Sequence, residues 1–391
     1  MALSPAIDRR IVDQLARATA LERSGVATGL WQFYDDTVRG AVSDFRRKSN
    51  ADPRRFVGSR LLVVKGAKPG ERGVIMADYT YVFPLLAGLF DLEAIARRYF
   101  IVLEPSWSDC CTPEILQFTR FDFPVLIQSI EPRDKPLLAK VGGNCSLVPT
   151  APNWWVDYRT MRPAPAAERD IDVIMIAAWA RFKRHWRFFR ILSNLKGRGH
   201  RLKVALVGYQ NDKTAADILA EARYFGVEDQ VQLFERLSAA EVAGLLSRSK
   251  LHLLWSRREG ANRAIIEAML ADVPVVVREG LTYGLKYPYI NEQTGRFATE
   301  DNLADVLLEV MANRARYSPR EWVLNNMTCQ KAVTILEGRL QECARAVGEP
   351  WTSGIVARTS ALDTQQYWDP ADRARFATDY QFLESTIRPS V

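Results

Sequence analysis

Two glutamates, Glu259 and Glu267, are the residues whose type and spacing most clearly permit chemistry in this sequence. Glu259 follows a short apolar run at residues 251–255, which we predict to be a buried strand, and Glu267 lies inside a helix predicted over residues 262–271. Their separation of eight positions is about two helical turns, so both carboxylates can face the same ligand. Because carboxylates accept hydrogen bonds from adjacent sugar hydroxyls, a sugar is a suitable ligand.

The residues directly after Glu259 suit an anion. Gly260 lets the backbone approach a ligand closely, and the amides of Ala261, Asn262 and Arg263 lie at the positive end of the predicted helix. A structural alternative is that Glu259 caps this helix and that Glu267 lies on its solvated face. A solvated face is disfavoured by the apolar neighbours of Glu267, which are Ile265, Ile266, Met269 and Leu270.

A basic loop supplies the cations that a phosphate group needs. Arg181, Lys183 and Arg184 follow a predicted strand at residues 173–177 and lead into a helix predicted over residues 186–196. Cations at this position can offset the charge of a leaving phosphate. The alternative is a solvated loop without a ligand. A position directly after a strand favours the functional interpretation, because open α/β sheets bind ligands at the carboxyl ends of their strands.

These candidate residues need a scaffold, and the sequence predicts two open α/β domains. The chain has 391 residues, of which 48% are hydrophobic and 25% charged, which is typical of a globular protein with about 150 residues per domain. Short runs rich in branched residues alternate with helical patterns in both halves. We predict buried parallel strands at residues 61–64, 74–76, 100–103, 125–127 and 146–148, and then at 173–177, 204–207, 231–234, 251–255 and 273–277.

A proline-containing segment at residues 163–170 separates the two halves. We therefore predict a first Rossmann-like, doubly wound domain at residues 1–165, a second at 166–335 and a helical tail at 336–391. Whether the tail returns to pack on the first domain stays open at this point. Doubly wound domains joined in this way bind ligands in the cleft that they face, outside the carboxyl ends of their strands.

Composition excludes several classes of protein. The formal net charge of +7 suits a nucleic acid, an anionic membrane surface or a phosphorylated ligand, but no repeat of basic and aromatic residues predicts a nucleic-acid partner. No apolar run approaches the roughly 18 residues of a membrane span, and the polar start of the chain does not resemble a signal peptide, so we expect a cytoplasmic protein. The five cysteines and three histidines have no metal-site or disulfide spacing.

The run from Ser256 to Val276 resembles the E-x7-E signature of the retaining GT-B glycosyltransferases of family 4, the glycosyl transferases group 1. Glu259, Gly260, Glu267 and the segment 273–276 match it, whereas Ala261 and Asn262 stand where Phe-Gly is usual and Asp272 replaces a glycine. The resemblance implies that Glu259 contacts the donor sugar, that Glu267 contacts the ribose hydroxyls, and that the amides of residues 260–263 bind the diphosphate.

Further positions extend the resemblance over residues 150–330. Lys183 resembles the lysine of the family that contacts the diphosphate, and Arg181 is the substitute for an arginine that is absent at Ala178. Gly208 resembles the glycine beside the donor. Arg236 lies in a strand and loop, 231–237, that resemble those facing the nucleotide base. The second domain is thereby implied to be the donor domain and the first the acceptor-side domain.

The first domain contains no recognisable acceptor motif. Glu104, Ser106 and Trp107 follow a predicted buried strand and are expected to face the acceptor, although Trp107 suits a packed core equally well. Two histidines are interpreted as packed residues, because we predict that His200 begins a strand and that His252 lies within one.

The resemblance implies a glycosyltransferase that moves a sugar from a nucleotide-diphosphate donor to a hydroxyl acceptor, with retention at the anomeric carbon. We expect the acceptor to be a saccharide or a lipid-linked saccharide, which leaves peripheral association with the inner face of the membrane open. No cofactor or metal is expected, since the only Asp-x-Asp motif, Asp170 and Asp172, precedes its strand. A nucleotide-sugar epimerase of the same fold and a non-catalytic partner subunit remain the alternatives.

Overall fold

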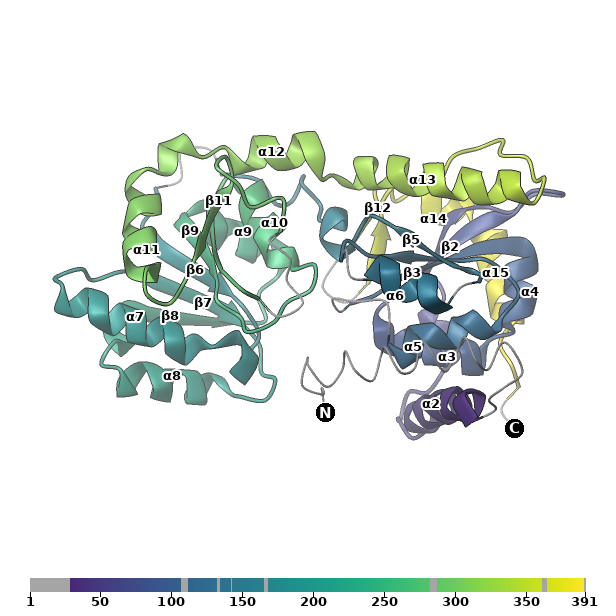
Figure 1. Cartoon of the computed structure of the whole chain (residues 1–391), viewed down its shortest axis with the longest axis horizontal. Helices are drawn as coiled ribbons and strands as arrows, with labels where there is room; N and C mark the ends of the chain where they lie inside the picture. Colours follow the sequence, from purple (N-terminus) through teal and green to yellow (C-terminus); the bar gives the residue numbers. More distant parts are fainter. Residues whose placement is uncertain are drawn as a thin grey trace. The chain divides into compact units, whose positions relative to one another are not determined.

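The computed structural model describes residues 29–106, 112–131, 134–141, 143–164, 168–281, 287–360 and 364–389. The chain divides into two compact units: unit 1 is Met1–Trp155 with Cys329–Val391, and unit 2 is Val156–Thr328. Unit 2 is one continuous stretch, whereas unit 1 takes residues from both sides of it (Figure 1). The sequence placed the boundaries after residues 165 and 335, and the compact units divide after Trp155 and Thr328.

Unit 2 is a doubly wound α/β domain. Its described residues form a six-stranded sheet in the order β11-β10-β9-β6-β7-β8, and all neighbouring strands are parallel. The strands are Ile171–Ile176 (β6), Val204–Gly208 (β7), Val231–Glu235 (β8), Ser249–Leu254 (β9), Val275–Arg278 (β10) and Gly295–Ala298 (β11). The helices are His185–Gly197 (α7), Ala215–Tyr224 (α8), Ala239–Ser247 (α9), Arg263–Leu270 (α10), Leu303–Ala312 (α11) and Pro319–Asn326 (α12).

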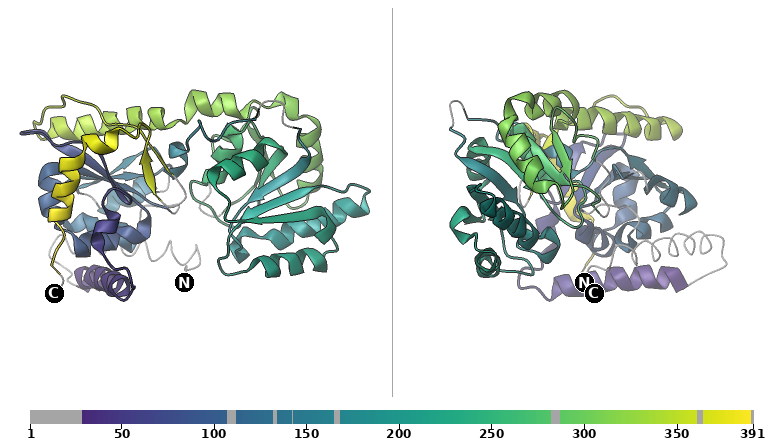
Figure 2. Two further views of the ribbon diagram at one scale, coloured as in Figure 1. Left: turned by 180° about the vertical axis from the view of Figure 1, so that it is seen from behind. Right: turned by 60° about the vertical axis from the view of Figure 1, so that its left-hand side comes forward.

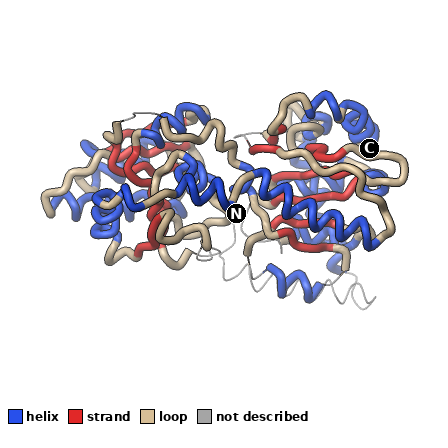
Figure 3. The backbone as a smooth tube through the Cα atoms, turned by 90° about the horizontal axis from the view of Figure 1, so that it is seen from above, coloured by secondary structure: helices blue, strands red, loops and turns tan. Residues whose placement is uncertain are grey.

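The helices of unit 2 cover both faces of this sheet. The apolar sides of α7, α8 and α11 share one core with β6, β7 and β9, to which Phe188, Ile218 and Leu307 contribute. Helices α9 and α10 pack on the other face, and α12 packs on α10. Figure 3 shows the strands enclosed between helices in each unit. Helices α8 and α9 begin at capping boxes, Thr214 with Asp217 and Ser238 with Glu241, which fix their first turns.

Unit 1 contains a second sheet, with five strands in the order β1-β2-β3-β4-β5 among the described residues. They are Leu61–Lys65 (β1), Gly73–Asp78 (β2), Tyr99–Glu104 (β3), Val125–Gln128 (β4) and Cys145–Val148 (β5). Strands β2 to β5 are parallel, as predicted. The prediction that residues 61–64 form a parallel strand is wrong, because β1 is antiparallel to β2. The short connection between them suits a hairpin, whereas a parallel crossover needs roughly a dozen residues.

The helices of unit 1 come from both parts of the chain. Those before β5 are Gly29–Arg46 (α2), Phe83–Leu89 (α3), Leu92–Arg98 (α4), Pro113–Leu116 (α5) and Asp134–Val141 (α6), and those of the C-terminal segment are Cys329–Ala346 (α13), Asp372–Arg375 (α14) and Ala377–Ser385 (α15). The segment also contains an antiparallel hairpin, Arg358–Ser360 (β12) and Gln365–Tyr367 (β13). The predicted helical tail is confirmed by α13, α14 and α15, and this hairpin is an addition to it.

The C-terminal segment packs on unit 1 along β1, as Figure 2 shows in yellow. The amide of Val356 donates to the carbonyl oxygen of Val64 at 2.8 Å, and the hydroxyl of Tyr367 donates to the carbonyl oxygen of Val63 at 2.6 Å. The segment thereby satisfies backbone groups that an edge strand would otherwise expose. None of the helices in the described parts of the chain is both long and apolar enough to cross a membrane.

Candidate functional site

The candidate site lies where the order of strands in unit 2 reverses. Strands β6 and β9 are neighbours, but the chain continues from β6 to β7 on one side and from β9 to β10 on the other. The loops that follow β6 and β9 therefore diverge at the carboxyl ends of adjacent strands, which is the position where doubly wound sheets bind ligands. The amide of Arg257, after β9, donates to the carbonyl oxygen of Phe182, after β6, at 2.7 Å, and this bond joins the two loops.

Lys183 and Glu259 meet at this junction. The ammonium group of Lys183 forms an ion pair with Oε1 of Glu259. Both groups are largely shielded from water, since the Lys183 side chain is 11% and the Glu259 side chain 9% exposed. Nδ2 of Asn262 donates to Oε2 of Glu259 at 3.1 Å, so both oxygens of the carboxylate are held. The two residues assigned to catalysis from the sequence are thus in direct contact.

Asn262 also starts the helix that follows. Its Oδ1 accepts a hydrogen bond from the amide of Ile265 at 3.1 Å, which is a typical N-cap, and α10 begins at the next residue. The amide of Asn262 itself donates to the carbonyl oxygen of Gly260 at 3.0 Å. The predicted anion site at residues 260–263 therefore has an internal partner for one of its amides, and its asparagine side chain both caps α10 and orients Glu259.

Glu267 lies on α10, one turn after Arg263. Their side chains form an ion pair at 3.6 Å between Nη2 and Oε1. Burial raises the pKa of Glu267, and the positive charge of Arg263 opposes this increase. The carboxylate is therefore largely shielded, as its apolar neighbours in the sequence indicated, and it has a single charged neighbour within its own helix.

Gly208 ends β7, and Arg236 directly follows the neighbouring strand β8. A Cβ atom on Gly208 would lie 2.2 Å from the carbonyl oxygen of Ala177, so only glycine permits this approach of β7 to the loop after β6. Arg236 has a positive φ of 53°, and its amide donates to the carbonyl oxygen of Gly208 at 3.1 Å. The side chains of Arg236 and Arg181 are both exposed at this edge of the sheet, and the amide of Arg181 donates to Asp212 at 2.9 Å.

The residues assigned to the acceptor side belong to unit 1. Glu104 is 4% exposed; it forms an ion pair with Arg358 of the C-terminal hairpin and accepts a hydrogen bond from Gln128 at 3.1 Å. Ser106 exchanges hydrogen bonds with Thr80 at 3.3 Å. Trp107 lies outside the described residues. The structure therefore places Glu104 in a buried ion pair and Ser106 beside it at the carboxyl end of β3.

The structure also places the histidines and the Asp-x-Asp motif that the sequence analysis considered. Burial and nearby lysine charges lower the pKa values of His185 and His252 to about 3, so both are neutral at pH 7. His252 is buried in β9 as predicted, but His200 precedes β7 and is exposed, so the prediction that it begins a strand is wrong. Asp170 and Asp172 lie at the amino end of β6 and pair with Arg248 and Lys250. Within the described ranges, no three His, Cys, Asp or Glu side chains are grouped to hold a metal ion.

Sequence reasoning missed several residues around the site. The hydroxyl of Tyr287 donates to the carbonyl oxygen of Gly260, and the Tyr287 ring stacks on Tyr289 with centroids 4.8 Å apart. The ring of Phe182 lies under two cations, with Lys183 Nζ at 5.0 Å and the Arg258 guanidinium at 5.2 Å from its centroid. Phe182 and Arg258 occur inside the two loops that were singled out, whereas nothing in the sequence near Tyr287 indicates its contact.

Comparison with known proteins finds sequence similarity in unit 2. Residues 157–323 match the family model of the glycosyl transferases group 1. A GDP-mannose:cellobiosyl-diphosphopolyprenol alpha-mannosyltransferase of Komagataeibacter xylinus is 31% identical over 105 residues, which are 26% of this chain and 27% of that enzyme. The similar segment is thus little more than a quarter of that relative.

Solved structures share the fold of the chain at low identity. TarM superposes with a TM-score of 0.53 and 16% identity over 69% of this chain and 54% of TarM. Sucrose-phosphate synthase of Thermosynechococcus elongatus has a TM-score of 0.53 and 15% identity over 70% of this chain and 74% of its own. HepE of Anabaena, solved with UDP, has a TM-score of 0.50 and 14% identity over 70% and 79% of the two chains. Residues 157–323 of unit 2 are therefore similar to the glycosyl transferases group 1, and the chain has the α/β fold of these solved GT-B structures.

Proposed function

We propose that this chain is a glycosyltransferase that binds a nucleotide-diphosphate sugar on unit 2 and transfers the sugar to a hydroxyl acceptor with retention of configuration. The observation that carries the proposal is the contact between Lys183 and Glu259 at the junction of β6 and β9. It joins a cation suited to a diphosphate and a carboxylate suited to sugar hydroxyls at the position where such sheets bind nucleotides. The family match of residues 157–323 supports it.

Donor binding would exchange the partners of this ion pair. Lys183 would turn from Glu259 to the diphosphate, where its charge stabilises the leaving group as the bond to the sugar breaks. Glu259 would then be free to accept hydrogen bonds from sugar hydroxyls, with Asn262 still holding its second oxygen. Glu267, which is shielded on α10, is proposed to accept hydrogen bonds from the ribose hydroxyls. Arg181 and Arg236, exposed at the same edge of the sheet, would face the diphosphate and the base.

The proposed reaction needs no separate general base. The bond between the anomeric carbon and the phosphate oxygen breaks, the acceptor oxygen bonds to the same face of that carbon, and the acceptor proton moves to the departing phosphate oxygen. Positive charge at the phosphate comes from Lys183 and from the amino end of α10. We therefore propose turnover without a divalent cation. EDTA should leave the rate unchanged, and a rate that recovers only when Mg²⁺ is restored would contradict this.

The acceptor is proposed to be a saccharide, either soluble or linked to a lipid. The mannosyltransferase of Komagataeibacter xylinus, by its name, acts on a cellobiose carried by a diphosphopolyprenol, and this supports a lipid-linked acceptor. A matched pair of acceptors that share one saccharide, free or linked to a lipid diphosphate, would test the preference. A preference for the linked form would support peripheral association with a membrane, and equal rates would contradict it.

The proposal is tested by ligand binding followed by turnover. UDP, GDP, ADP and their sugars should be compared in a thermal-shift assay. We expect the nucleotides of one base to raise the apparent melting temperature of the full chain. With that donor, Lys183→Ala and Glu259→Gln should lower the rate by roughly 10²- to 10³-fold. Lys196→Ala, at the end of α7 and in an exposed pair with Asp229, is the control and should keep the wild-type rate.

Two further readouts separate the alternatives. Supplied with donor alone, an epimerase would interconvert the sugar, whereas the proposed transferase gives at most slow hydrolysis. The anomeric configuration of the product, read by NMR coupling constants, should equal that of the donor. Wild-type rates in both site variants would overturn the assignment of Lys183 and Glu259, and the absence of binding by every nucleotide would overturn the donor site itself.

A further inference from the structure

A second cluster of charges lies in unit 2 beside the proposed donor site, and it centres on Glu300. Three arginines bind this one carboxylate. Arg184 contacts Oε1, Arg187 contacts Oε2 at 2.8 Å and Arg190 contacts Oε2 at 2.9 Å. Lys183 and Arg184 are neighbours in the sequence, but their side chains pair with different acids, Glu259 and Glu300. The cluster is therefore separate from the Lys183 ion pair.

The members of this cluster all come from the carboxyl edge of the sheet or from the start of α7. Arg184 follows β6 and precedes α7, Arg187 and Arg190 lie in the first two turns of α7, and Glu300 follows β11. Arg278 ends β10, in register with Ala298 at the end of β11. The first turn of α7 contains no acidic residue, so the positive end of the helix dipole adds to the positive charge of the arginines.

Positive charge in the cluster exceeds what Glu300 can compensate. Burial together with the charges of Arg278 and Arg187 lowers the pKa of Arg184, although Glu300 opposes this. Burial also lowers the pKa of Arg278; the negative charge of Glu300 opposes this decrease, and the positive charges of Arg257 and Arg187 add to it. Like charges held close together repel, and such an arrangement is typical of a site that awaits an anion.

The backbone at Arg184 is a further sign that its guanidinium is required. Its φ of 63° and ψ of 38° lie in the left-handed region, which glycine adopts freely and other residues adopt at a cost of roughly 1 kcal/mol or more. This conformation turns the chain from β6 into α7. Glycine would adopt this conformation at a lower cost, and the ion pair of the Arg184 side chain with Glu300 is the contact that a glycine could not make.

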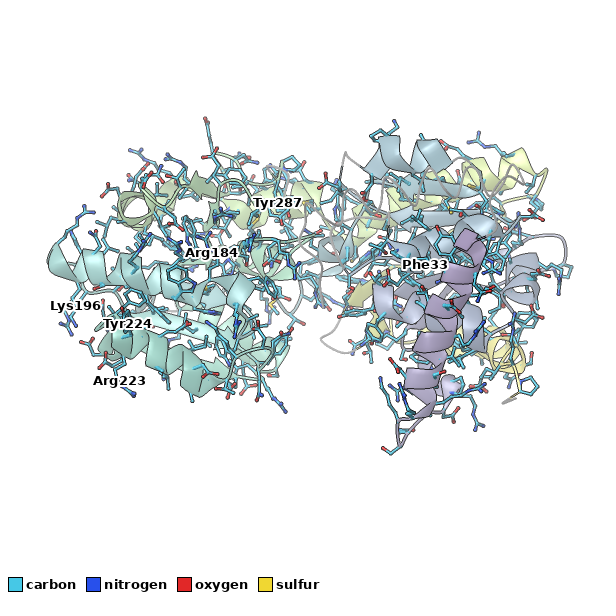
Figure 4. All side chains as sticks on the ribbon, turned by 60° about the horizontal axis from the view of Figure 1, so that its bottom comes forward. Phe33, Arg184, Lys196, Arg223, Tyr224 and Tyr287 are labelled. Atoms are coloured by element: carbon cyan, nitrogen blue, oxygen red, sulfur yellow. The ribbon has the colours of Figure 1, made fainter. Side chains whose placement is uncertain are left out.

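We infer that Arg184, Arg187 and Arg278 form a binding site for a phosphate group, separate from the donor diphosphate site and occupied by the carboxylate of Glu300 when no phosphate is bound. A phosphate has more acceptor oxygens and more negative charge than a carboxylate, so it can bind guanidinium groups that arrive from several elements. Figure 4 shows Arg184 in this region of unit 2, apart from Arg223 at the end of α8. The inference does not depend on sugar transfer.

The test is isothermal titration of the full chain with inorganic phosphate at low ionic strength, in the presence of saturating concentrations of the nucleoside diphosphate that binds most tightly. Wild type should bind one phosphate. Arg278→Gln, which breaks no contact with Glu300, should weaken binding by about 10-fold, a typical loss for one charge-assisted contact. Arg223→Gln, with the same change of charge on the exposed end of α8, should change it less than 2-fold.

Glu300→Gln distinguishes a binding site from a structural ion-pair hub. If phosphate replaces the carboxylate, this variant removes the competitor and should bind phosphate several-fold more tightly than wild type. If the arginines only serve the fold, Glu300→Gln should lower the melting temperature without tighter binding, and this result would overturn the inference. Circular dichroism of each variant verifies that the protein remains folded.

Two more outcomes are decisive. Complete displacement of phosphate by the nucleoside diphosphate would mean that the cluster belongs to the donor site, which overturns the separate site. Glucose 1-phosphate as a second probe distinguishes the source of the phosphate group. Tighter binding of this ester than of the free ion would assign the site to a phosphorylated substrate, and the reverse would assign it to inorganic phosphate. If no nucleotide binds, the same titration without nucleotide still tests the cluster, because Arg278→Gln should weaken phosphate binding and Glu300→Gln should tighten it.

Discussion

Lys183 and Glu259 form an ion pair that joins two loops 76 positions apart in the sequence. Because both side chains are shielded from water, removal of one partner leaves a buried charge without its counterion. Lys183→Met and Glu259→Gln should each lower the free energy of unfolding of unit 2 by about 3 kcal/mol, and the double variant should recover most of this loss. Urea unfolding of the single and double variants gives the coupling.

The exposed pair of Lys196 and Asp229 is the matched control. Its side chains are 34% and 42% exposed, so the same cycle there should give a coupling of less than about 1 kcal/mol. If the loss of unfolding free energy in the Lys183 and Glu259 double variant equals the sum of the losses in the single variants, the two side chains do not stabilise each other. Recovery of stability without recovery of activity in the double variant would separate the structural role of the pair from its proposed role in catalysis.

Gly208 is predicted to be intolerant of even one methyl group. Alanine there would bring Cβ to 2.2 Å from the carbonyl oxygen of Ala177 and to 3.0 Å from the ring of Trp179, so β7 or the loop after β6 would have to shift. Gly208→Ala should lower the melting temperature by several degrees and weaken nucleotide binding. Gly244→Ala, in α9 with no atom within 4 Å of the new Cβ, should be neutral or stabilising. Equal effects of the two substitutions would contradict the steric argument.

Asp78 should make the stability of unit 1 depend on pH. Burial and the neighbouring Glu104 raise the pKa of its carboxyl group from 3.8 to about 7, although Arg60 opposes this. Between these values the folded state binds the proton more tightly than the unfolded state, so stability falls as the pH rises through this window and levels off above it. Asp78→Asn should remove this slope, measured as the urea midpoint from pH 5 to 8.

The control for Asp78 is Asp305→Asn, which changes one exposed carboxylate that pairs with Arg198. This variant should retain the wild-type slope. Parallel curves for wild type and Asp78→Asn would show that Asp78 does not titrate in this range.

Asp379 is predicted to anchor the C-terminal segment to unit 1. Its Oδ1 accepts hydrogen bonds from the hydroxyl of Tyr99 at 2.5 Å and from the amide of Ala67 at 3.1 Å. Asp379→Ala leaves the buried Tyr99 hydroxyl without this partner and should lower the free energy of unfolding by about 1–3 kcal/mol. Limited proteolysis should then cleave the C-terminal segment faster than in the wild type. Asp369→Ala, which removes a single exposed bond to the amide of Ala371, should cost less. Equal proteolysis of both variants would contradict the anchoring role.

Much of unit 2 was predictable because its central strands, such as β7 and β9, are largely buried. The apolar runs at residues 204–207 and 251–255 correspond to β7, Val204–Gly208, and β9, Ser249–Leu254. Strand β11, with the sequence GRFA, has no such run and was missed, since its place is fixed by pairing with β10. The hairpin β12 and β13 was missed for a similar reason, because three-residue strands of mostly polar residues leave no periodic signal.

The candidate site was predictable in its residues but not in its contacts. Glu259 and Lys183 were found because each follows a strand, and the rule for parallel sheets brings such residues to one edge. Nothing local indicates that Arg358 pairs with Glu104, or that Glu300 binds three arginines. These pairs join elements that are distant in the sequence, so their partners depend on packing, which a single sequence does not contain.

The division of unit 1 between two parts of the chain has a consequence for synthesis on the ribosome. Unit 2 is complete once residue 328 has emerged, whereas the sheet of unit 1 still lacks Arg358, which binds Glu104, and Tyr380, which accepts a hydrogen bond from the amide of Val63. Domains generally fold as their residues become available. Of the two units, the one that begins first is therefore the one that finishes last, and its buried carboxylate must wait for its counterion until residue 358 has emerged.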